Sequence, residues 1–140
     1  MQENGFLDDE PSTFGTVADL LADLGERNTV TATPDMDVAG AIGLLKSHGI
    51  SQMPVVAGGK VVGMIHERLL LEEALLRKPV GARVGELADQ QYCTVGMDTE
   101  ISVVTDLLRR VRVALVFEDD KFRGVLTRID VLDHIARRAV

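Results

Sequence analysis

The sequence GVLTRID at residues 124–130 decides the fold, because it closes a unit that occurs twice in the chain. The first copy closes with VVGMIHERL at residues 61–69, where a glycine inside an apolar stretch again precedes a polar junction. In both copies the pattern predicts a β-strand that runs directly into a helix. The second copy places Thr127 and Asp130 at this junction, and the first copy does not.

The repeat extends along the whole of each unit. Residues 35–45 align with residues 98–108 at a shift of 63 positions, and the Lys-x-x-Gly sequence at 60–63 aligns with that at 121–124 at a shift of 61. The second copy therefore lacks two residues between its first helix and its second strand. A period of about 60 residues exceeds the 20 to 50 or so of solenoid repeats, which favours two fused subdomains over an array.

Composition excludes several classes of function. The chain has 140 residues, 46% of them hydrophobic and 26% charged, which is ordinary for one compact domain or two intimate halves. A net charge of −7 and an aromatic content of 4% disfavour a nucleic-acid partner. No apolar run approaches the roughly 18 residues of a membrane helix, and residues 1–10 lack the features of a signal peptide, so we expect a cytoplasmic protein with no membrane partner. The single cysteine, Cys93, precludes an internal disulfide.

The order of predicted elements is βαββα, twice. We expect a linker from a preceding domain over residues 1–15, the first motif over 16–78 and the second motif over 79–140. Asp35 or Asp37 caps the first long helix, which ends near Gly49. The pattern predicts leading helices at 16–20 and 83–87, strands at 29–33 and 94–95, helices at 38–49, 67–78, 102–110 and 130–138, and hairpins at 53–56 with 61–64 and at 113–117 with 122–126. The expected fold class is α/β (α+β), with small mixed sheets covered by helices.

Two stretches carry a family resemblance: HGISQMPVV at residues 48–56 and GVLTRID at residues 124–130. With the repeat, they resemble a tandem pair of CBS domains, often called a Bateman module, over roughly residues 16–140. This resemblance implies two βαββα motifs packed as a pseudo-two-fold pair. Within the family the chain is most similar to the C-terminal regulatory region of bacterial cystathionine β-synthases. QENGFL at residues 2–7 is similar to the segment after their pyridoxal-phosphate catalytic domain, and ALV at residues 114–116 replaces a usual Pro-Val-Val in a similar way.

The resemblance implies a regulatory module that senses an adenosine ligand such as AMP, ATP or S-adenosylmethionine and carries out no catalysis itself. Pyridoxal phosphate is implied only for the catalytic domain of the parent enzyme. That catalytic domain is an expected partner of this module, in addition to the adenosine ligand. An alternative is a purely structural dimerisation module with a vestigial nucleotide cleft. A third class, an enzyme in its own right, is disfavoured because no nucleophile, base and orienting residue fall together in the sequence.

The residues of the second junction suit an adenosine ligand on chemical grounds. The Asp130 carboxylate can accept hydrogen bonds from both ribose hydroxyls, and Thr127 can add a hydroxyl contact. Gly124 allows a close approach of backbone and ligand. The alternative is a capping box, in which Thr127 caps the last helix and Asp130 reaches back to the Thr127 amide. The pattern alone favours the capping box. The resemblance to CBS domains implies the ribose role instead, because the motif follows a hairpin strand of the second copy. The first copy places His66 and Leu69 at the equivalent positions and so lacks the carboxylate.

The family arrangement implies the rest of the nucleotide site. For Ile50 and Met53 the alternative is a place in the core. Arg128 is a candidate phosphate partner. Ser51 stands where methionine-sensing relatives are expected to carry an acidic residue, which counts against S-adenosylmethionine unless Asp35 or Asp37 substitutes. The predicted site residues are Asn28, Thr29, Ile50, Ser51, Gln52, Met53, Gly124, Thr127, Arg128, Ile129 and Asp130.

The remaining polar residues predict neither a metal nor a catalytic site. The three histidines, at positions 48, 66 and 134, share no metal-ligand spacing with one another or with Cys93, so we expect surface or capping roles for them. The amphipathic helices around residues 38–45 and 102–108 carry more apolar surface than one small module covers. We therefore expect a two-fold homodimer.

Overall fold

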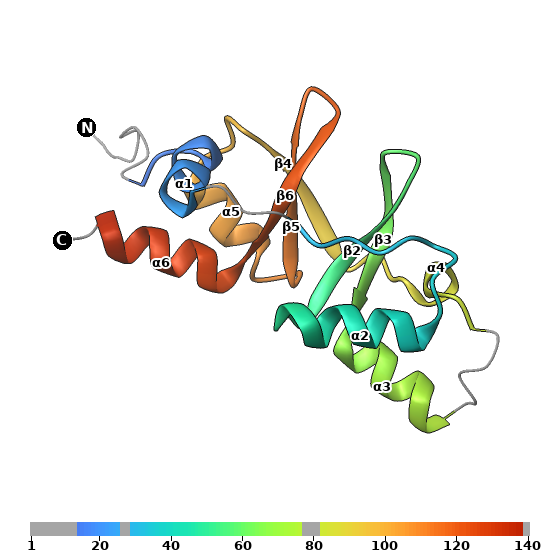
Figure 1. Ribbon diagram of the computed structural model, residues 1–140. Helices are drawn as coiled ribbons and strands as arrows, with labels where there is room; N and C mark the ends of the chain where they lie inside the picture. The colour runs from blue at the N-terminus through green and yellow to red at the C-terminus, as the bar shows by residue number, and fades with distance from the viewer. Residues whose placement is uncertain (1–13, 26–28, 77–81, 139–140) are drawn as a thin grey trace, which may run out of the picture. The chain divides into compact units, whose positions relative to one another are not determined.

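The computed structural model describes residues 14–25, 29–76 and 82–138, which divide into two compact units. Residues 28–91 form the first, here called the central unit, and residues 1–27 with 92–140 form the second, the terminal unit. Figure 1 labels the helices and strands of both. The α/β class and the duplication expected from the sequence are confirmed.

The central unit is a β-hairpin covered by helices. Its strands β2 and β3 pair antiparallel, and α4 follows α3 after the gap in the described residues. The buried residues of α2 are Val38, Ala41 and Leu45, so the predicted amphipathic face does point into the core. Its elements are α2 (Val38–His48), β2 (Gln52–Ala57), β3 (Lys60–His66), α3 (Glu67–Leu76) and α4 (Val84–Leu87).

The ends of α2 follow the sequence signals. Of the two predicted caps, Asp37 is the one used, since its Oδ1 accepts a 2.7 Å hydrogen bond from the Gly40 N–H. Asp35 instead accepts a 2.7 Å hydrogen bond from the Thr33 hydroxyl, in the turn before the helix. Gly49 ends the helix with φ 61°, a left-handed conformation that glycine adopts without strain.

The strand predicted at residues 29–33 is reduced to one bridge. Ala32 pairs with Val55 in parallel, through hydrogen bonds from the Ala32 N–H to the Pro54 carbonyl (2.9 Å) and from the Val56 N–H to the Ala32 carbonyl (2.8 Å). Pro34 and the Thr33 to Asp35 turn follow at once and end the pairing. The full strand at this position was therefore a wrong expectation.

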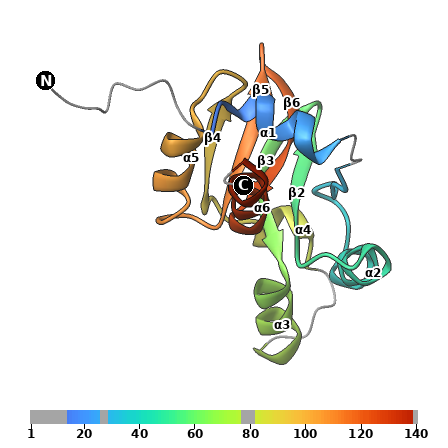
Figure 2. The ribbon, with the colours of Figure 1, turned by 90° about the vertical axis from the view of Figure 1, so that its left-hand side faces the viewer.

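The terminal unit contains a three-stranded sheet in the order β4-β5-β6. β4 runs parallel to β5, and β5 pairs antiparallel with β6. Figure 2 gives a second view of its strands and helices. The helices bury Leu20, Ile101, Leu108 and Val131 against the sheet residues Val116 and Leu126. Its elements are α1 (Val17–Leu24), β4 (Tyr92–Gly96), α5 (Ile101–Leu107), β5 (Val113–Glu118), β6 (Lys121–Thr127) and α6 (Arg128–Arg138).

The leading helix of each copy packs in the other copy's unit. Val17 and Leu20 of α1 are fully buried in the core of the terminal unit, and the Ala18 N–H donates to the Met97 carbonyl at 2.9 Å. Conversely, Val84 of α4 lies in the core of the central unit, where its N–H donates to the Met36 carbonyl at 2.8 Å. The motif boundaries 16–78 and 79–140 describe the sequence repeat and stay a prediction. The compact units are divided differently, because each of them contains the short leading helix of the other copy.

The two hairpins share their irregularities. In each hairpin the register shifts immediately on the turn side of the residue pair that contains the strand glycine. The shifts lie between Val55 and Val56, beside the pair Val55–Gly63, and between Val116 and Phe117, beside the pair Val116–Gly124. Each turn is made by two residues with positive φ. They are Gly58 (58°) and Gly59 (78°) in the central unit, and Asp119 (49°) and Asp120 (68°) in the terminal unit. Two left-handed residues match the twist of a tight hairpin.

Candidate functional site

The second strand-to-helix junction is built by Thr127, which ends β6, and Asp130 in the first turn of α6. The Thr127 N–H donates to Asp130 Oδ2 at 3.0 Å, and the Thr127 hydroxyl donates to the same oxygen at 3.2 Å. Both side chains are partly exposed. The capping contact weighed in the sequence is therefore present in this structure, and it leaves the pair at the surface of the unit.

The same arrangement recurs at α1, where no ligand is predicted. The Thr16 N–H donates to Asp19 Oδ2 at 2.9 Å, and the Thr16 hydroxyl donates at 3.3 Å. The backbone N–H of Thr16 is the main cause that lowers the pKa of Asp19 below its ordinary value, because it stabilises the charged carboxylate. The capping geometry thus belongs to the Thr-x-x-Asp pattern in general and does not by itself identify a ribose site.

The neighbours of Asp130 are positioned by the same junction. Arg128 is exposed, but its side chain is hydrogen-bonded: its Nε donates to the Leu108 carbonyl at 2.8 Å and its Nη2 to the Val111 carbonyl at 3.4 Å. These carbonyls follow the end of α5, so Arg128 caps that helix, and its role as a phosphate partner remains a prediction. Ile129 is 68% exposed, and Gly124 is buried opposite Val116 in the sheet.

The first junction has different chemistry. His66, which occupies the position of Thr127, is buried, and its Nε2 lies 3.0 Å from Asp89 Oδ2. Asp89 is held in place by a two-way backbone pairing with Met64, at 2.8 and 2.9 Å. Within the part of the chain that the structure describes, His66 Nδ1 is buried without a hydrogen-bond partner. The expectation of a surface or capping role for His66 was wrong, because its strand runs into the core before the helix begins.

The residues predicted to line the adenine belong to the central unit. Met53 is 1% exposed and part of the core, which is the alternative weighed for it. Ser51 is exposed, and its carbonyl accepts the Glu67 N–H at 2.9 Å. Gln52 begins β2, Ile50 is half-buried and Thr29 is exposed, while Asn28 lies outside the described residues. These residues belong to the central unit, whereas the Thr127 junction belongs to the terminal unit.

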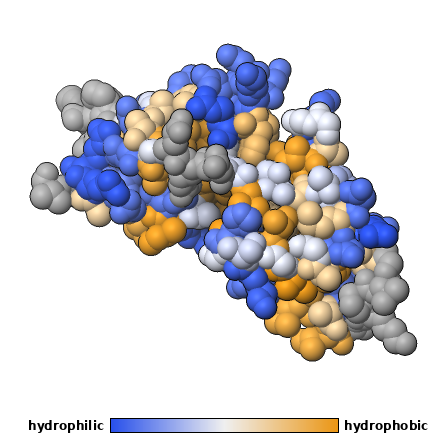
Figure 3. Space-filling view, viewed as in Figure 1, coloured by the Kyte–Doolittle hydropathy of each residue, from blue (hydrophilic) through white to orange (hydrophobic). Residues whose placement is uncertain are grey.

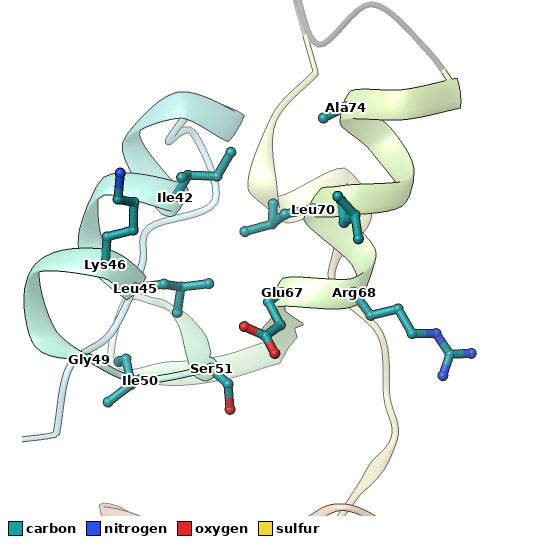
Figure 4. A pocket seen from close by; sticks show the side chains of 11 residues that line it. Ile42, Leu45, Lys46, Gly49, Ile50, Ser51, Glu67, Arg68, Leu70 and Ala74 are labelled. Atoms are coloured by element: carbon teal, nitrogen blue, oxygen red, sulfur yellow. The ribbon is translucent and has the colours of Figure 1, made fainter.

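Sequence reasoning missed a groove between α2 and α3. It has a volume of about 720 Å³ and a mainly aliphatic lining (Figure 4). Two of the predicted site residues, Ile50 and Ser51, lie at one end of it, beside Glu67 and Arg68. In the space-filling view, apolar residues gather over α2 and α3 (Figure 3). The lining residues are Ile42, Leu45, Lys46, Gly49, Ile50, Ser51, Glu67, Arg68, Leu70, Leu71 and Ala74.

The equivalent groove of the terminal unit is smaller. It lies between α5 and α6 and has a volume of about 210 Å³. Every residue that lines it aligns with a residue of the larger groove, for example Leu108 with Leu45, and Arg128 with Glu67. The duplication was therefore the available signal, although it does not show which groove is open. The lining residues are Thr105, Leu108, Arg109, Arg128, Val131, Leu132 and Ile135.

Among the described residues, no group of three or more His, Cys, Asp and Glu side chains is arranged to hold a metal ion. None of their helices combines the length and the apolar character that crossing a membrane requires.

The fold and the junctions define a class of protein: a tandem pair of βαββα motifs in which one strand-to-helix junction keeps a threonine and a carboxylate. The family model of the CBS domain matches residues 18–76 and 84–137. The chain therefore belongs to the CBS domain family, as the resemblance predicts.

Relatives of known structure agree. CBSX2 in complex with AMP is 26% identical, covers 90% of this chain and 99% of its own, and superposes with a TM-score of 0.75. The CBS domain of a bacterial CNNM/CorC family Mg²⁺ transporter in complex with ATP is 21% identical, covers 87% of each chain and superposes with a TM-score of 0.75, which shows the fold alone.

A curated relative matches over most of this chain. Cystathionine β-synthase from Dictyostelium discoideum is 27% identical over an alignment 152 residues long. The alignment covers 96% of this chain and 30% of the relative. An A-adding tRNA nucleotidyltransferase from Geobacter sulfurreducens is 27% identical over 81% of this chain and 13% of its own length. The chain thus spans less than a third of the curated relatives described here.

Proposed function

We propose that this chain is a regulatory module that binds an adenosine ligand of the AMP, ATP or S-adenosylmethionine class. The observation that carries the proposal is the difference between the two junctions. Thr127 and Asp130 present a partly exposed hydroxyl and carboxylate in the second copy, whereas the first copy buries His66 against Asp89. One copy thus retains groups suited to a ribose, and the other has converted the position to packing.

The relative with AMP bound supports the class of ligand. CBSX2 binds AMP on a fold that superposes on this chain over nearly its full length. Asp130, at the start of α6, would accept the ribose hydroxyls, and the N-terminal N–H groups of α6 would favour a phosphate. Arg128 can add a phosphate contact only by sharing or releasing its bonds to the Leu108 and Val111 carbonyls. The family resemblance assigns the adenine contacts to Thr29, residues 50–53 and Asn28, and this assignment stays a prediction.

The finer proposal concerns the parent protein. The similarity to a cystathionine β-synthase over 96% of this chain, together with the short QENGFL and ALV sequences, favours a cytoplasmic pyridoxal-phosphate enzyme of that type. In that setting the cofactor and the catalysis belong to another domain. The module would alter activity only through its different affinities for the ligand in two arrangements of that enzyme, which limits the coupling to about 1 to 3 kcal/mol.

Titration calorimetry with AMP, ADP, ATP and S-adenosylmethionine tests the proposal. We expect one ligand per chain, because only one junction keeps the ribose groups. Asp130→Ala should weaken binding about tenfold to a hundredfold, since a hydrogen bond to a charged group is worth about 1.5 to 3 kcal/mol. A stoichiometry of two with similar affinities would contradict the difference between the junctions.

Asp19→Ala is the matched control for Asp130→Ala. Asp19 makes the same pair of contacts to Thr16 that Asp130 makes to Thr127, at distances that agree within 0.1 Å. The control removes a capping box from the same unit without touching the proposed site, so it should leave affinity unchanged. Equal losses in both variants would show that capping, rather than ribose recognition, is the role of Asp130.

The second candidate is a structural dimerisation module, favoured by exposed apolar side chains. Those on α3 are Leu71 (59% exposed) and Leu75 (75%), and those on α6 are Ile129 (68%) and Leu132 (60%). A homodimer is compatible with ligand binding. Dimerisation would be the sole function of the module only if no adenosine ligand binds. Sedimentation should show a dimer at tens of micromolar and a monomer for Leu71→Glu, because a charge at an apolar interface is costly. A wild-type monomer would remove this candidate.

A further inference from the structure

His134 is a fully buried polar residue in the terminal unit, and the proposed function does not use it. It lies on α6, one turn after Asp130, and its side chain is 0% exposed. A surface or capping role was expected for it and was wrong. A buried imidazole needs partners for its ring nitrogens, because an unpaired polar group in the interior is costly.

Both ring nitrogens of His134 face oxygen acceptors. Nδ1 lies 2.6 Å from Asp23 Oδ2, and Nε2 lies 2.6 Å from the Phe14 carbonyl oxygen. A carbonyl oxygen and an ionised carboxylate can only accept hydrogen bonds. A neutral imidazole carries one N–H and can donate to only one of them, whereas the imidazolium carries two and satisfies both. The geometry therefore fits the doubly protonated ring.

The charges around the ring agree with a positive imidazolium. α1 contributes Asp23 and Asp19, and the pKa of Asp19 is lowered chiefly by the Thr16 backbone N–H. From α6, Arg138 Nε lies 3.6 Å from Asp23 Oδ2, so this carboxylate faces the Arg138 guanidinium as well as the His134 ring. The Asp23 oxygen thereby links the last turn of α1 to α6 at two points.

The two partners of His134 lie at opposite ends of α1. Phe14 precedes the helix and Asp23 is in its last turn. Besides the Arg138 contact to Asp23, this segment is held by the burial of Val17 and Leu20 and by backbone hydrogen bonds that need no titratable group, such as that from the Val17 N–H to the Thr99 carbonyl (2.9 Å). His134 is therefore the point at which the attachment of α1 depends on a proton.

We propose that His134 is a proton-dependent latch between α6 and α1. The doubly protonated ring donates to Phe14 and Asp23 together, and loss of one proton leaves one of these two contacts without a hydrogen. α1 then keeps its backbone hydrogen bonds and its buried side chains but loses one of its two hydrogen bonds to His134. The proposal needs no nucleotide and does not rest on the proposed function.

Ring nitrogen NMR of protein labelled with ¹⁵N-histidine tests the protonation directly. The chain has three histidines, so His134→Gln identifies the His134 signals by their disappearance. At neutral pH we expect both His134 nitrogens to carry protons. A single protonated nitrogen at neutral pH would overturn the proposal. If His134→Gln does not fold, Asp23→Asn serves instead: the His134 ring should then lose its second proton at a lower pH than in the wild type, and an unchanged titration would overturn the latch.

Hydrogen exchange tests the consequence for α1. Between about pH 6 and about pH 9, the protection factors of the α1 amides should fall about tenfold more in the wild type than in His134→Gln. His48→Gln is the matched control, because His48 is exposed and should leave the wild-type pH response intact. An equal fall in wild type and His134→Gln would mean that the proton on His134 does not hold the helix.

Discussion

The two helix-pair grooves differ about threefold in volume, although equivalent positions line them. The groove of the central unit measures about 720 Å³ and that of the terminal unit about 210 Å³. Three changes account for this. Ala74 is replaced by the larger Ile135, Glu67 is replaced by Arg128, and the loop at residues 49–51 has lost two residues in the second copy. Duplication therefore preserved the scaffold, while side-chain volume and one short deletion decided which groove stays open.

The strand-to-helix junctions differ in the opposite way from the grooves, because the copy with the smaller groove has the more exposed junction. The copy with the open groove has buried His66 against Asp89 at its junction, and the copy with the filled groove keeps Thr127 and Asp130 partly exposed. Arg128 connects the two features of the second copy, since it follows Thr127 and reaches the carbonyls beyond α5. A residue adjacent to a proposed ligand site can thus be committed to holding two helices together.

The largest expected effect tests which unit α1 belongs to. Leu20→Ala removes a fully buried side chain from the core of the terminal unit and should destabilise it by about 2 to 5 kcal/mol. Native-state hydrogen exchange should show the loss at Leu115 in β5 more than at Val55 in β2. Leu132→Ala, a truncation of a 60% exposed leucine in the same unit, should cost far less. A greater loss at Val55 would assign α1 to the central unit and undo the comparison.

A smaller effect is expected from opening the filled groove. Arg128→Ala removes the hydrogen bonds to the Leu108 and Val111 carbonyls and should cost about 1 kcal/mol, because Arg128 is exposed and water replaces part of the contact. Urea denaturation measures the change. Glu67→Ala at the equivalent position of the central unit serves as the control, with an expected cost near zero. Equal costs would show that Arg128 has no special structural role.

The smallest effect concerns the hairpin turns. Asp120 adopts a left-handed conformation that its counterpart Gly59 adopts without a Cβ. Asp120→Gly produces the Asp-Gly pair favoured in such turns and should stabilise the terminal unit by about 0.5 kcal/mol. The reverse change, Gly59→Asp, should destabilise the central unit by a similar amount. Thermal unfolding of the two variants shows whether the turns are equivalent; shifts of the same sign would contradict this.

The sequence by itself determined the features that depend on neighbours along the chain. The repeat, both hairpins, a helix cap at Asp35 or Asp37 and the Gly49 terminus follow from spacing, because turns and caps are made by residues a few positions apart. The family followed from the resemblance of residues 48–56 and 124–130 to CBS domains. The Thr127 to Asp130 contact was also anticipated as an alternative, since it spans one helical turn. Helix ends were predicted less well, and the structure moves the start of α6 from residue 130 to residue 128.

Only the tertiary structure decided the features that join distant residues. His134 meets Phe14 and Asp23 across more than 100 positions, and His66 meets Asp89 across 23, so no local pattern distinguishes either from a surface histidine. The packing of α1 and α4 in exchanged units is likewise invisible in the repeat. A short apolar helix can be buried by any complementary core. Its sequence therefore predicts that one face is buried, but it does not predict which unit the helix packs against.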